Sequence, residues 1–377
     1  MPHASVTRPV LFILDGAQRV TGSLVAARRQ AELLAGTVDC VIVLTDRADI
    51  DAQQLTSFRD VVRLPMRPLR RSASSVFTYP LSLLRSARRL ARALDDAGCT
   101  RLQVNDYFLA EGFLVRLFGF RGRIATWVRI DPRHYGGPVA KAWLLAARGV
   151  SDRLVAVSDF VRGCLPPGYD AQVVYDPAPD LPRAAAPNGS KFVFIGNYIE
   201  GKGQDFAIAA FHRIARDHSE AELRLNGSDM GLDRNRAYLN RLRGVAAQGA
   251  GADRITLGGF VEDVGPVMDH ALASLTLSRS ESFSLTCQEA SARGVAVIAT
   301  RCGGPEEIVE HGRTGWLVPV GDVAATADAM RAALADPERT RAMGEEGAAL
   351  VRQRFGSARF VEALREIFDL TPDRQRV

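Results

Sequence analysis

Short runs of apolar residues alternate with longer stretches of helical periodicity from one end of the chain to the other. Ten of these runs have the length and composition of buried strands. They cover residues 10–14, 40–44, 102–104, 124–128, 154–157, 192–195, 223–225, 255–257, 274–277 and 295–299. Strands that alternate with helices form parallel sheets covered on both faces, so we predict an α/β protein.

The alternation is interrupted at residues 176–190, DPAPDLPRAAAPNGS, which are rich in Pro and Ala and have no periodicity. Such a stretch is typical of an interdomain linker. A chain of 377 residues, 47% of them hydrophobic, is long enough for two cores. We therefore predict an N-terminal domain at 1–180 and a second domain at 190–355. A last helical segment within 356–377 is expected to pack back on the N-terminal domain.

The apolar runs and the distribution of charge indicate a cellular location. No apolar run reaches the ~20 residues that a transmembrane helix needs, and we expect a cytoplasmic protein. Net charge is +5, and residues 61–94 contain eight arginines and no acid, interleaved with apolar residues. This stretch suits an anionic membrane surface at the inner face of the plasma membrane. The alternative is a solvated helix face in an arginine-rich protein. No nucleic-acid partner is expected.

The five cysteines are scattered and form no Cys-x-x-Cys pair, so neither a disulfide framework nor a structural zinc site is expected. The histidines show no metal-ligand spacing, and there is no Asp-x-Asp motif. The sequence therefore predicts no bound metal. In open α/β domains ligands bind beyond the carboxyl ends of the strands. Two such domains facing across a cleft would suit a nucleotide diphosphate joined to a second group.

The densest motif runs from residue 278 to 319, SRSESFSLTCQEASARGVAVIATRCGGPEEIVEHGRTGWLVP. A strand leads into a loop with Glu281, a helix is predicted from about Ser284, and Glu289 follows in its second turn. The amides of Phe283, Ser284 and Leu285 would be open helix-start donors, which suit a phosphate. Two carboxylates would repel the phosphate and should accept hydrogen bonds from sugar hydroxyls.

A second motif, VFIGNYIEGKGQDFAIAAF at residues 193–211, places Lys202 in a Gly-rich loop at the start of a helix. An ammonium group in this position is suited to neutralising a phosphate. Together the two motifs predict a diphosphate flanked by two sugars.

These motifs resemble the donor site of retaining GT-B glycosyltransferases of family four, the glycosyl transferases group 1 type. The resemblance implies two Rossmann-like domains and a metal-independent transfer from a UDP- or GDP-sugar, which is a substrate, without a further cofactor. It rests on Lys202, Glu281, Phe283, Glu289, Gly303, Gly304, Glu307, Ile308, Gly312, Gly315, Leu317, Val318 and Pro319. Ser282 and Ser284 replace two loop glycines, Glu306 replaces a proline, and Asn197 replaces an arginine.

The resemblance also implies residue roles. Glu281 would bind the hydroxyls of the donor sugar, Glu289 the ribose, and Lys202 the diphosphate, with Asn197 and the loop 282–285 nearby. Phe260 and Val261 would touch the base through backbone atoms. In the N-terminal half, Gly22 matches the family's Gly loop and would let the donor diphosphate or the acceptor approach closely; the alternative is a simple turn glycine.

The N-terminal half matches the family less closely. Asn105 and Asp106 match the end of a strand that often reads His-x-His-Asp in the family. Arg129 or Asp131 occupies the place of the usual histidine near the reacting centre, with His134 a few residues on.

The predicted activity is hexosyl transfer to a saccharide or lipid-linked saccharide, as in cell envelope polysaccharide synthesis. One alternative is a catalytically degenerate nucleotide-sugar binder. Another is a dinucleotide-dependent oxidoreductase, which requires Gly-x-Gly-x-x-Gly after the first strand. The segment Asp15-Gly16-Ala17-Gln18-Arg19 lacks that pattern.

Overall fold

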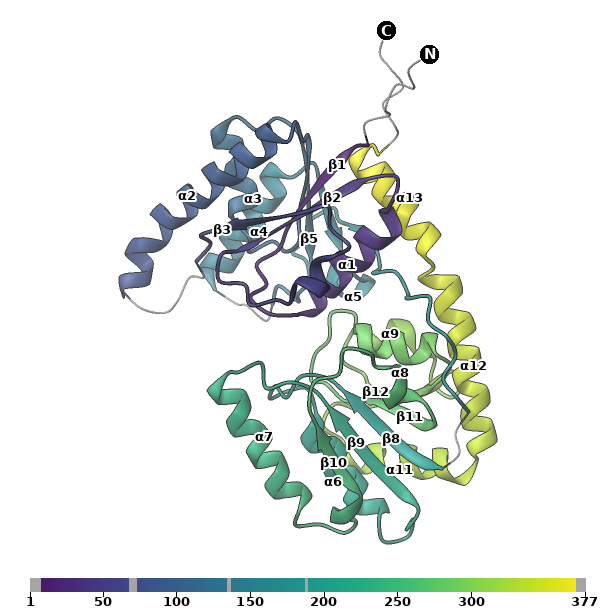
Figure 1. The fold of residues 1–377 in the computed structure, drawn as a ribbon. Coiled ribbons are helices and arrows are strands. Elements are labelled where there is room, and N and C mark those ends of the chain that lie inside the picture. The colour runs from purple at the N-terminus through teal and green to yellow at the C-terminus, as the bar shows by residue number, and fades with distance from the viewer. Residues whose placement is uncertain (1–7, 68–72, 134–136, 187–188, 371–377) are drawn as a thin grey trace. The chain divides into compact units, whose positions relative to one another are not determined.

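The computed structural model describes residues 8–67, 73–133, 137–186 and 189–370. It divides into two compact units (Figure 1). One unit contains Met1–Pro177 and Ser357–Val377, and the other contains Ala178–Gly356. The chain thus passes from the first unit to the second inside the predicted linker at 176–190 and returns to the first unit at Ser357.

The first unit is built on a seven-stranded parallel sheet with the strand order β3-β2-β1-β4-β5-β6-β7. Its strands are β1 (Val10–Leu14), β2 (Asp39–Thr45), β3 (Asp60–Leu64), β4 (Arg101–Val104), β5 (Arg123–Val128), β6 (Arg153–Ala156) and β7 (Gln172–Val173). The α-helices of this unit are α1 (Gly22–Leu34), α2 (Ala73–Asp96), α3 (Glu111–Leu114), α4 (Pro138–Val150), α5 (Asp159–Gly163) and α13 (Ser357–Phe368). Two 3-10 turns, η1 (Ala52–Leu55) and η2 (Val115–Phe118), complete it.

The C-terminal helix α13 belongs to this first unit. It contacts α1 and β5, and the Phe368 ring stacks on Trp127 with ring centroids 6.0 Å apart. Both rings are fully buried. Burial of two such large side chains anchors the end of the chain to the N-terminal sheet.

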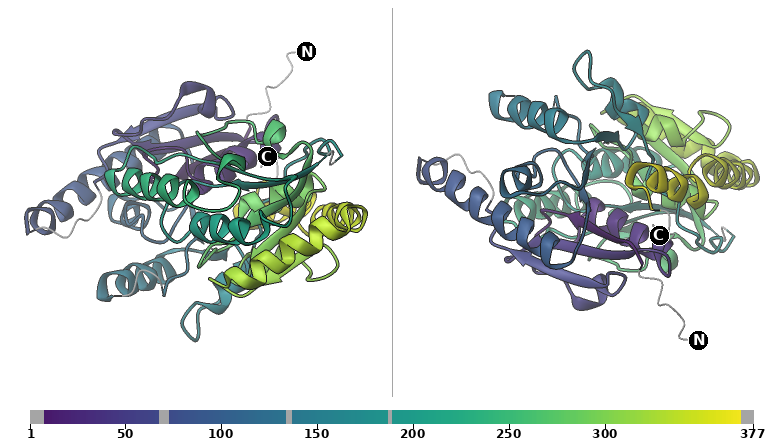
Figure 2. Two further views of the ribbon diagram at one scale, coloured as in Figure 1. Left: turned by 90° about the horizontal axis from the view of Figure 1, so that it is seen from below. Right: turned by 90° about the horizontal axis from the view of Figure 1, so that it is seen from above.

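The second unit is built on a six-stranded parallel sheet with the order β10-β9-β8-β11-β12-β13. Its strands are β8 (Ser190–Ile195), β9 (Ala221–Asn226), β10 (Ile255–Gly258), β11 (Ala271–Thr276), β12 (Ala296–Thr300) and β13 (Gly315–Val318). Its helices are α6 (Gln204–Ile214), α7 (Asp233–Ala246), α8 (Gly265–Met268), α9 (Leu285–Ala292), α10 (Pro305–Ile308), α11 (Val323–Ala335) and α12 (Pro337–Arg354), with a 3-10 turn η3 (Ala252–Arg254). Helices lie on both faces of each sheet (Figures 1 and 2).

The α/β prediction is confirmed, because all strand pairs in both sheets are parallel. Each of the ten apolar runs overlaps a strand. Three strands, β3, β7 and β13, are at sheet edges and were not among the predicted runs. Edge strands are short or partly exposed, so they lack the continuous apolar run that identifies a central strand.

None of the described helices combines the length and the apolar character needed to cross a bilayer.

Candidate functional site

The strand order reverses once in each sheet, and the reversal determines where ligands bind. In the second unit it falls between β8 and β11, and in the first between β1 and β4. Chain segments that leave two such neighbouring strands diverge to opposite faces, which opens a crevice at the carboxyl edge. The loops that follow β8 and β11 contain Lys202 and Glu281.

Lys202 and Glu281 are in direct contact in the second unit. The Lys202 ammonium lies 2.7 Å from Glu281 Oε1, and the Ser278 hydroxyl donates to the same oxygen at 2.6 Å. The side chains of Lys202 and Glu281 are 37% and 15% exposed, so both can reach a ligand. The neighbouring Glu281 carboxylate raises the pKa of Lys202, and the ammonium stays charged at neutral pH.

The backbone around Glu281 is fixed by the turn at Gly303 and Gly304. The Gly304 amide donates to the Glu281 carbonyl at 2.8 Å, and the Glu281 amide donates to the Cys302 carbonyl at 3.2 Å. A Cβ on Gly304 would lie 2.3 to 2.5 Å from backbone atoms of Phe283. Only glycine permits this approach at position 304, and the φ of 114° at Gly303 favours glycine there as well.

Phe283 anchors the same loop to the unit's core. Its ring packs edge-to-face on Phe355 with centroids 5.2 Å apart, and both side chains are buried. Ser282 precedes it and is half-buried. The loop that contains Glu281 is therefore fixed by backbone hydrogen bonds to the Cys302–Gly304 turn and by the packing of Phe283 on Phe355.

The helix after this loop starts where the sequence predicts. Ser284 is the N-cap of α9, and its hydroxyl accepts from the Cys287 amide at 3.4 Å. Ser284 has a φ of 83°, a backbone conformation that favours the glycine it replaces. Among described residues, the amides of Ser284 and Leu285 donate to no acceptor. These amides therefore remain able to bind an anion.

The loop after β8 brings Lys202 close to the neighbouring strand. Gly203 has a φ of 90°, and a Cβ there would lie 2.1 Å from the Leu277 carbonyl oxygen. Asn197, which stands in place of an arginine, accepts from the Ser228 amide through Oδ1 at 3.2 Å. Its side chain thus connects two loops and contributes no positive charge.

Two further predicted donor residues, Glu289 and Val261, lie on elements of the same unit. Glu289 is half-buried in the second turn of α9, and Val261 is half-buried in the loop after β10. Phe260, beside it, is 57% exposed. The interactions of the described residues do not place Val261 against the Lys202–Glu281 pair.

A buried polar cluster marks the strand reversal of the first unit. Asn105, after β4, donates to Asp15, after β1, at 2.5 Å. Arg129, after β5, donates to Asn105 at 3.0 Å and forms a buried ion pair with Asp176 at 2.8 Å. Asp106 is also buried, and burial raises its pKa to about 8.

The other N-terminal candidates take no part in the hydrogen bonds of this cluster or lie outside the description, although Asn105 donates to the carbonyl of Ser23, beside Gly22, at 3.2 Å. Gly22 is exposed at the first position of α1, next to the N-cap Thr21. Asp131 accepts from the Arg133 amide and guanidinium at 2.9 Å. Burial raises the pKa of Asp131, but these hydrogen bonds outweigh it and the pKa is lowered overall. His134 lies outside the described residues.

Ser278, Asp15 and Asp176 are candidate site residues that sequence reasoning missed. Asp15 directly follows β1, and Ser278 and Asp176 lie two and three residues after β11 and β7. A polar residue just beyond the carboxyl end of a parallel strand is the signal that could have identified them. Among the described ranges no group of three or more His, Cys, Asp or Glu side chains is placed to hold a metal ion.

Comparison with known families agrees with the geometry of the second unit. A family model described as glycosyl transferases group 1 matches residues 182–350. This match includes both loops that hold Lys202 and Glu281.

Several curated relatives match parts of the chain, including proteins of Bacillus anthracis and Mycobacterium tuberculosis. The N-acetyl-alpha-D-glucosaminyl L-malate synthase of Bacillus anthracis is 38% identical over 116 residues, which are 31% of this chain and 30% of that protein. The GDP-mannose-dependent alpha-(1-6)-phosphatidylinositol monomannoside mannosyltransferase of Mycobacterium tuberculosis is 30% identical over 265 residues. That match covers 60% of this chain and 66% of the relative, so the chain spans less than two thirds of either protein.

Solved structures resemble nearly the whole chain. Anabaena Alr3699/HepE in complex with UDP-glucose has a TM-score of 0.81 at 16% identity, covering 96% of this chain and all of that one. Sucrose-phosphate synthase from Thermosynechococcus elongatus has a TM-score of 0.78 at 20% identity, with 97% of this chain and 100% of that one covered. At these identities the likeness shows the fold, which is GT-B.

Proposed function

The chain belongs, through residues 182–350, to the glycosyl transferases group 1 family and has the GT-B fold, and on this premise we propose a transfer reaction. The proposed reaction moves a hexose from a nucleotide-diphosphate sugar to a hydroxyl of a saccharide or lipid-linked saccharide. A UDP- or GDP-hexose is the proposed donor. The names of a GDP-mannose-dependent relative and of a fold neighbour bound to UDP-glucose support this choice.

The observation that carries the proposal is the contact between Lys202 and Glu281 beside the start of α9. One charged ammonium and the open amides of Ser284 and Leu285 form a suitable binding surface for a diphosphate. A carboxylate immediately beside them can accept hydrogen bonds from the hydroxyls of the attached sugar. The ammonium and the amides thus suit the two phosphates, and the carboxylate suits the attached sugar.

The proposed chemistry needs no metal and no further cofactor. As the bond between the anomeric carbon and the diphosphate oxygen breaks, negative charge grows on the leaving group. Lys202 and the α9 amides would stabilise that charge. The acceptor oxygen then bonds to the anomeric carbon from the side of the leaving group, and its proton leaves with the diphosphate. The product would retain the anomeric configuration.

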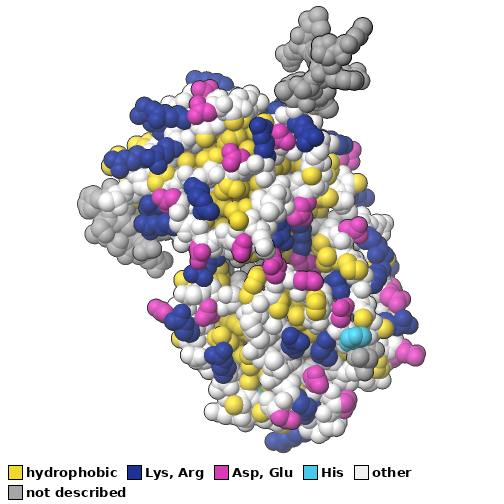
Figure 3. Space-filling model, viewed as in Figure 1, with side chains coloured by type: hydrophobic (Ala, Val, Ile, Leu, Met, Phe, Trp, Pro, Cys, Tyr) yellow, Lys and Arg dark blue, Asp and Glu magenta, His cyan; other side chains and the backbone are white. Residues whose placement is uncertain are grey.

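Helix α2 supports a peripheral position at an anionic membrane surface, at the inner face of the plasma membrane. Arg85, Arg88, Arg89 and Arg92 are all exposed on α2. Lys and Arg side chains gather at the upper left of Figure 3, where Figure 1 places α2. Leu81 and Leu84 are 54% and 41% exposed, whereas Leu90 and Leu94 are fully buried. The apolar residues that could enter a bilayer are thus confined to the first half of the helix.

A nucleotide-sugar binder without turnover is the second candidate. It is favoured by Asn197, which replaces an arginine and is already bonded to Ser228. The enzyme and the binder can be distinguished by incubation with a panel of UDP- and GDP-sugars. The assay detects sugar transfer or slow hydrolysis of the donor. Release of nucleoside diphosphate supports the enzyme. Donor binding without any release supports the binder.

A further inference from the structure

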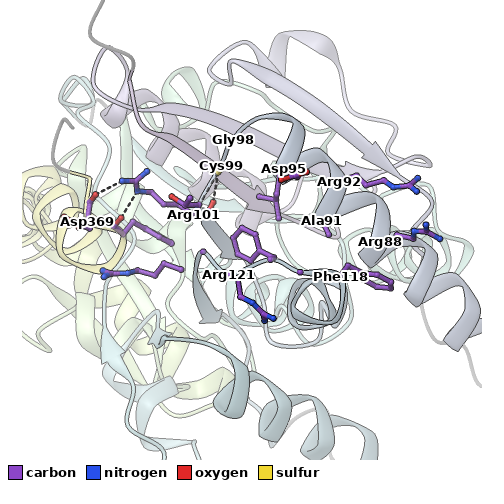
Figure 4. A pocket seen from close by; sticks show the side chains of 17 residues that line it. Arg88, Ala91, Arg92, Asp95, Gly98, Cys99, Arg101, Phe118, Arg121 and Asp369 are labelled. Atoms are coloured by element: carbon purple, nitrogen blue, oxygen red, sulfur yellow. Dashed lines mark hydrogen bonds between the residues drawn. The ribbon is translucent and has the colours of Figure 1, made fainter. Parts of the chain in front are cut away.

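A cavity of about 830 Å³ opens in the first unit at the amino ends of β4 and β5. It lies between the C-terminal half of α2, the turn that follows η2 and the end of α13 (Figure 4). The Asp15–Asn105 cluster lies at the carboxyl ends of β1 and β4. Because the strands are parallel, their amino ends lie on the side of the sheet opposite to their carboxyl ends. The cavity is therefore separate from that cluster.

Two of the arginines that line the cavity stabilise the end of α13. Arg101 donates to the Phe368 carbonyl at 2.8 Å and to the Asp369 carbonyl at 3.0 Å. Arg123 donates to the Ile367 carbonyl at 3.0 Å. Carbonyls at a helix C-terminus lack partners within the helix, and these guanidinium groups satisfy them. Their role is structural.

Three other arginines on the same cavity have no such role. Arg88 and Arg92 extend from α2, and Arg121 extends from the turn that follows η2 (Figure 4). All three are exposed, and within the described part of the chain none makes a hydrogen bond or an ion pair. Asp95 and Asp369 also line the cavity, so these three uncommitted arginines share it with two acidic residues.

Apolar side chains lie beside these charges. Phe118 lines the cavity and is 37% exposed, and Leu117 next to it is 69% exposed. A site with guanidinium groups and exposed apolar side chains favours an amphiphilic anion. Planar guanidinium groups match phosphate oxygens particularly well.

We propose that this cavity binds a phosphate-bearing ligand through Arg88, Arg92 and Arg121, at a site separate from the sugar-donor residues. The phosphate can come from a lipid headgroup or from a soluble phosphate compound. Only the lipid source rests on the proposed membrane position, and neither source depends on sugar transfer.

The test is isothermal titration of the full chain with monomeric dihexanoyl phosphatidic acid. The wild-type protein should bind it saturably at one site. The variant Arg88→Ser/Arg92→Ser/Arg121→Ser should bind at least about tenfold more weakly, since charge-assisted hydrogen bonds to the phosphate are lost. All three side chains are exposed, so the variant should keep the thermal midpoint of the wild type. The single variant Arg121→Ser, which leaves α2 unchanged, should also bind the lipid more weakly than the wild type.

The matched control, Arg216→Ser/Arg234→Ser/Arg359→Ser, removes the same charge from exposed positions elsewhere and should bind like the wild type. Inorganic phosphate is then titrated as a competitor of phosphatidic acid. If it binds as tightly as the lipid, the site is one for soluble phosphates; if it binds more weakly, the site is one for a lipid headgroup. Absence of saturable binding to either probe, or equal weakening in the control, would overturn the proposal. Failure of sugar transfer would remove the proposed function and leave this measurement intact.

Discussion

The ammonium of Lys202 contacts the carboxylate of Glu281 at 2.7 Å across 79 residues of sequence. Each residue comes from a loop at the strand reversal between β8 and β11. The contact holds the lysine in place before the proposed diphosphate would bind, and the three donors of an ammonium would allow it to bind both groups. Preorganisation of this kind lowers the cost of ordering side chains on binding.

Chelation of metal ions should leave sugar transfer unchanged, because Lys202 and the α9 amides supply the positive potential at the leaving diphosphate. The measurement is the initial rate of nucleoside diphosphate release with and without EDTA. Loss of activity that Mg²⁺ or Mn²⁺ restores would contradict the metal-free mechanism.

Replacement of Gly304 by alanine should reduce both stability and donor affinity. The new Cβ would lie 2.3 to 2.5 Å from the Phe283 backbone and would displace the Glu281 loop. A cost of about 1–3 kcal/mol is expected for such overpacking. Thermal unfolding and donor titration measure the two effects. The matched control is Gly244→Ala in α7, where nothing lies within 4 Å of the new Cβ. Equal effects of the two changes would contradict the packing argument.

Replacement of Ser284 by glycine should raise the stability of the protein, whereas replacement by alanine should lower it. Glycine removes the strain of a φ of 83°, which costs about 1 kcal/mol or more, and loses only a few tenths of a kcal/mol of capping. Alanine keeps the strain and loses the cap to the Cys287 amide, at about 1 kcal/mol. Denaturant unfolding should therefore rank Ser284→Gly above wild type and Ser284→Ala below it. The reverse order would show that the serine is not strained.

Asp106 should make stability depend on pH. Burial raises its pKa to about 8, whereas the unfolded chain releases this proton near pH 3.9. Between these values the folded state binds more protons, so this group lowers the free energy of unfolding by about 1.4 kcal/mol per pH unit as pH rises. Relative to wild type, Asp106→Asn should be more stable at pH 8 than at pH 5. The same difference at both pH values would mean that Asp106 ionises normally.

Much of the fold could be predicted because central parallel strands are buried on both faces and read as continuous apolar runs. β1 was predicted with its observed bounds, Val10–Leu14. β7 has two residues at a sheet edge and leaves no such pattern. Similarly, the start of α9 was predictable from the loop residues before Leu285, because capping is a local interaction.

Contacts between distant segments were less accessible from the sequence. Asp176 was read only as the first residue of a linker, yet it pairs with Arg129 in a buried ion pair. Ser278 was not singled out, although its hydroxyl bonds to Glu281. Such contacts depend on which strands become neighbours, and strand order is not a local property. In α2, the arginine pattern gave no sign that Leu90 and Leu94 face the core.

The most direct test is the dissociation constant of UDP- and GDP-hexoses for wild type, Lys202→Gln and the control Lys141→Gln. The account predicts that one of these donors binds the wild type and the control equally well. Lys202→Gln should bind it roughly ten- to a hundredfold more weakly, because a charged hydrogen bond to phosphate is lost. Binding of that donor to Lys202→Gln with unchanged affinity, or no binding of any donor to the wild type, would contradict it.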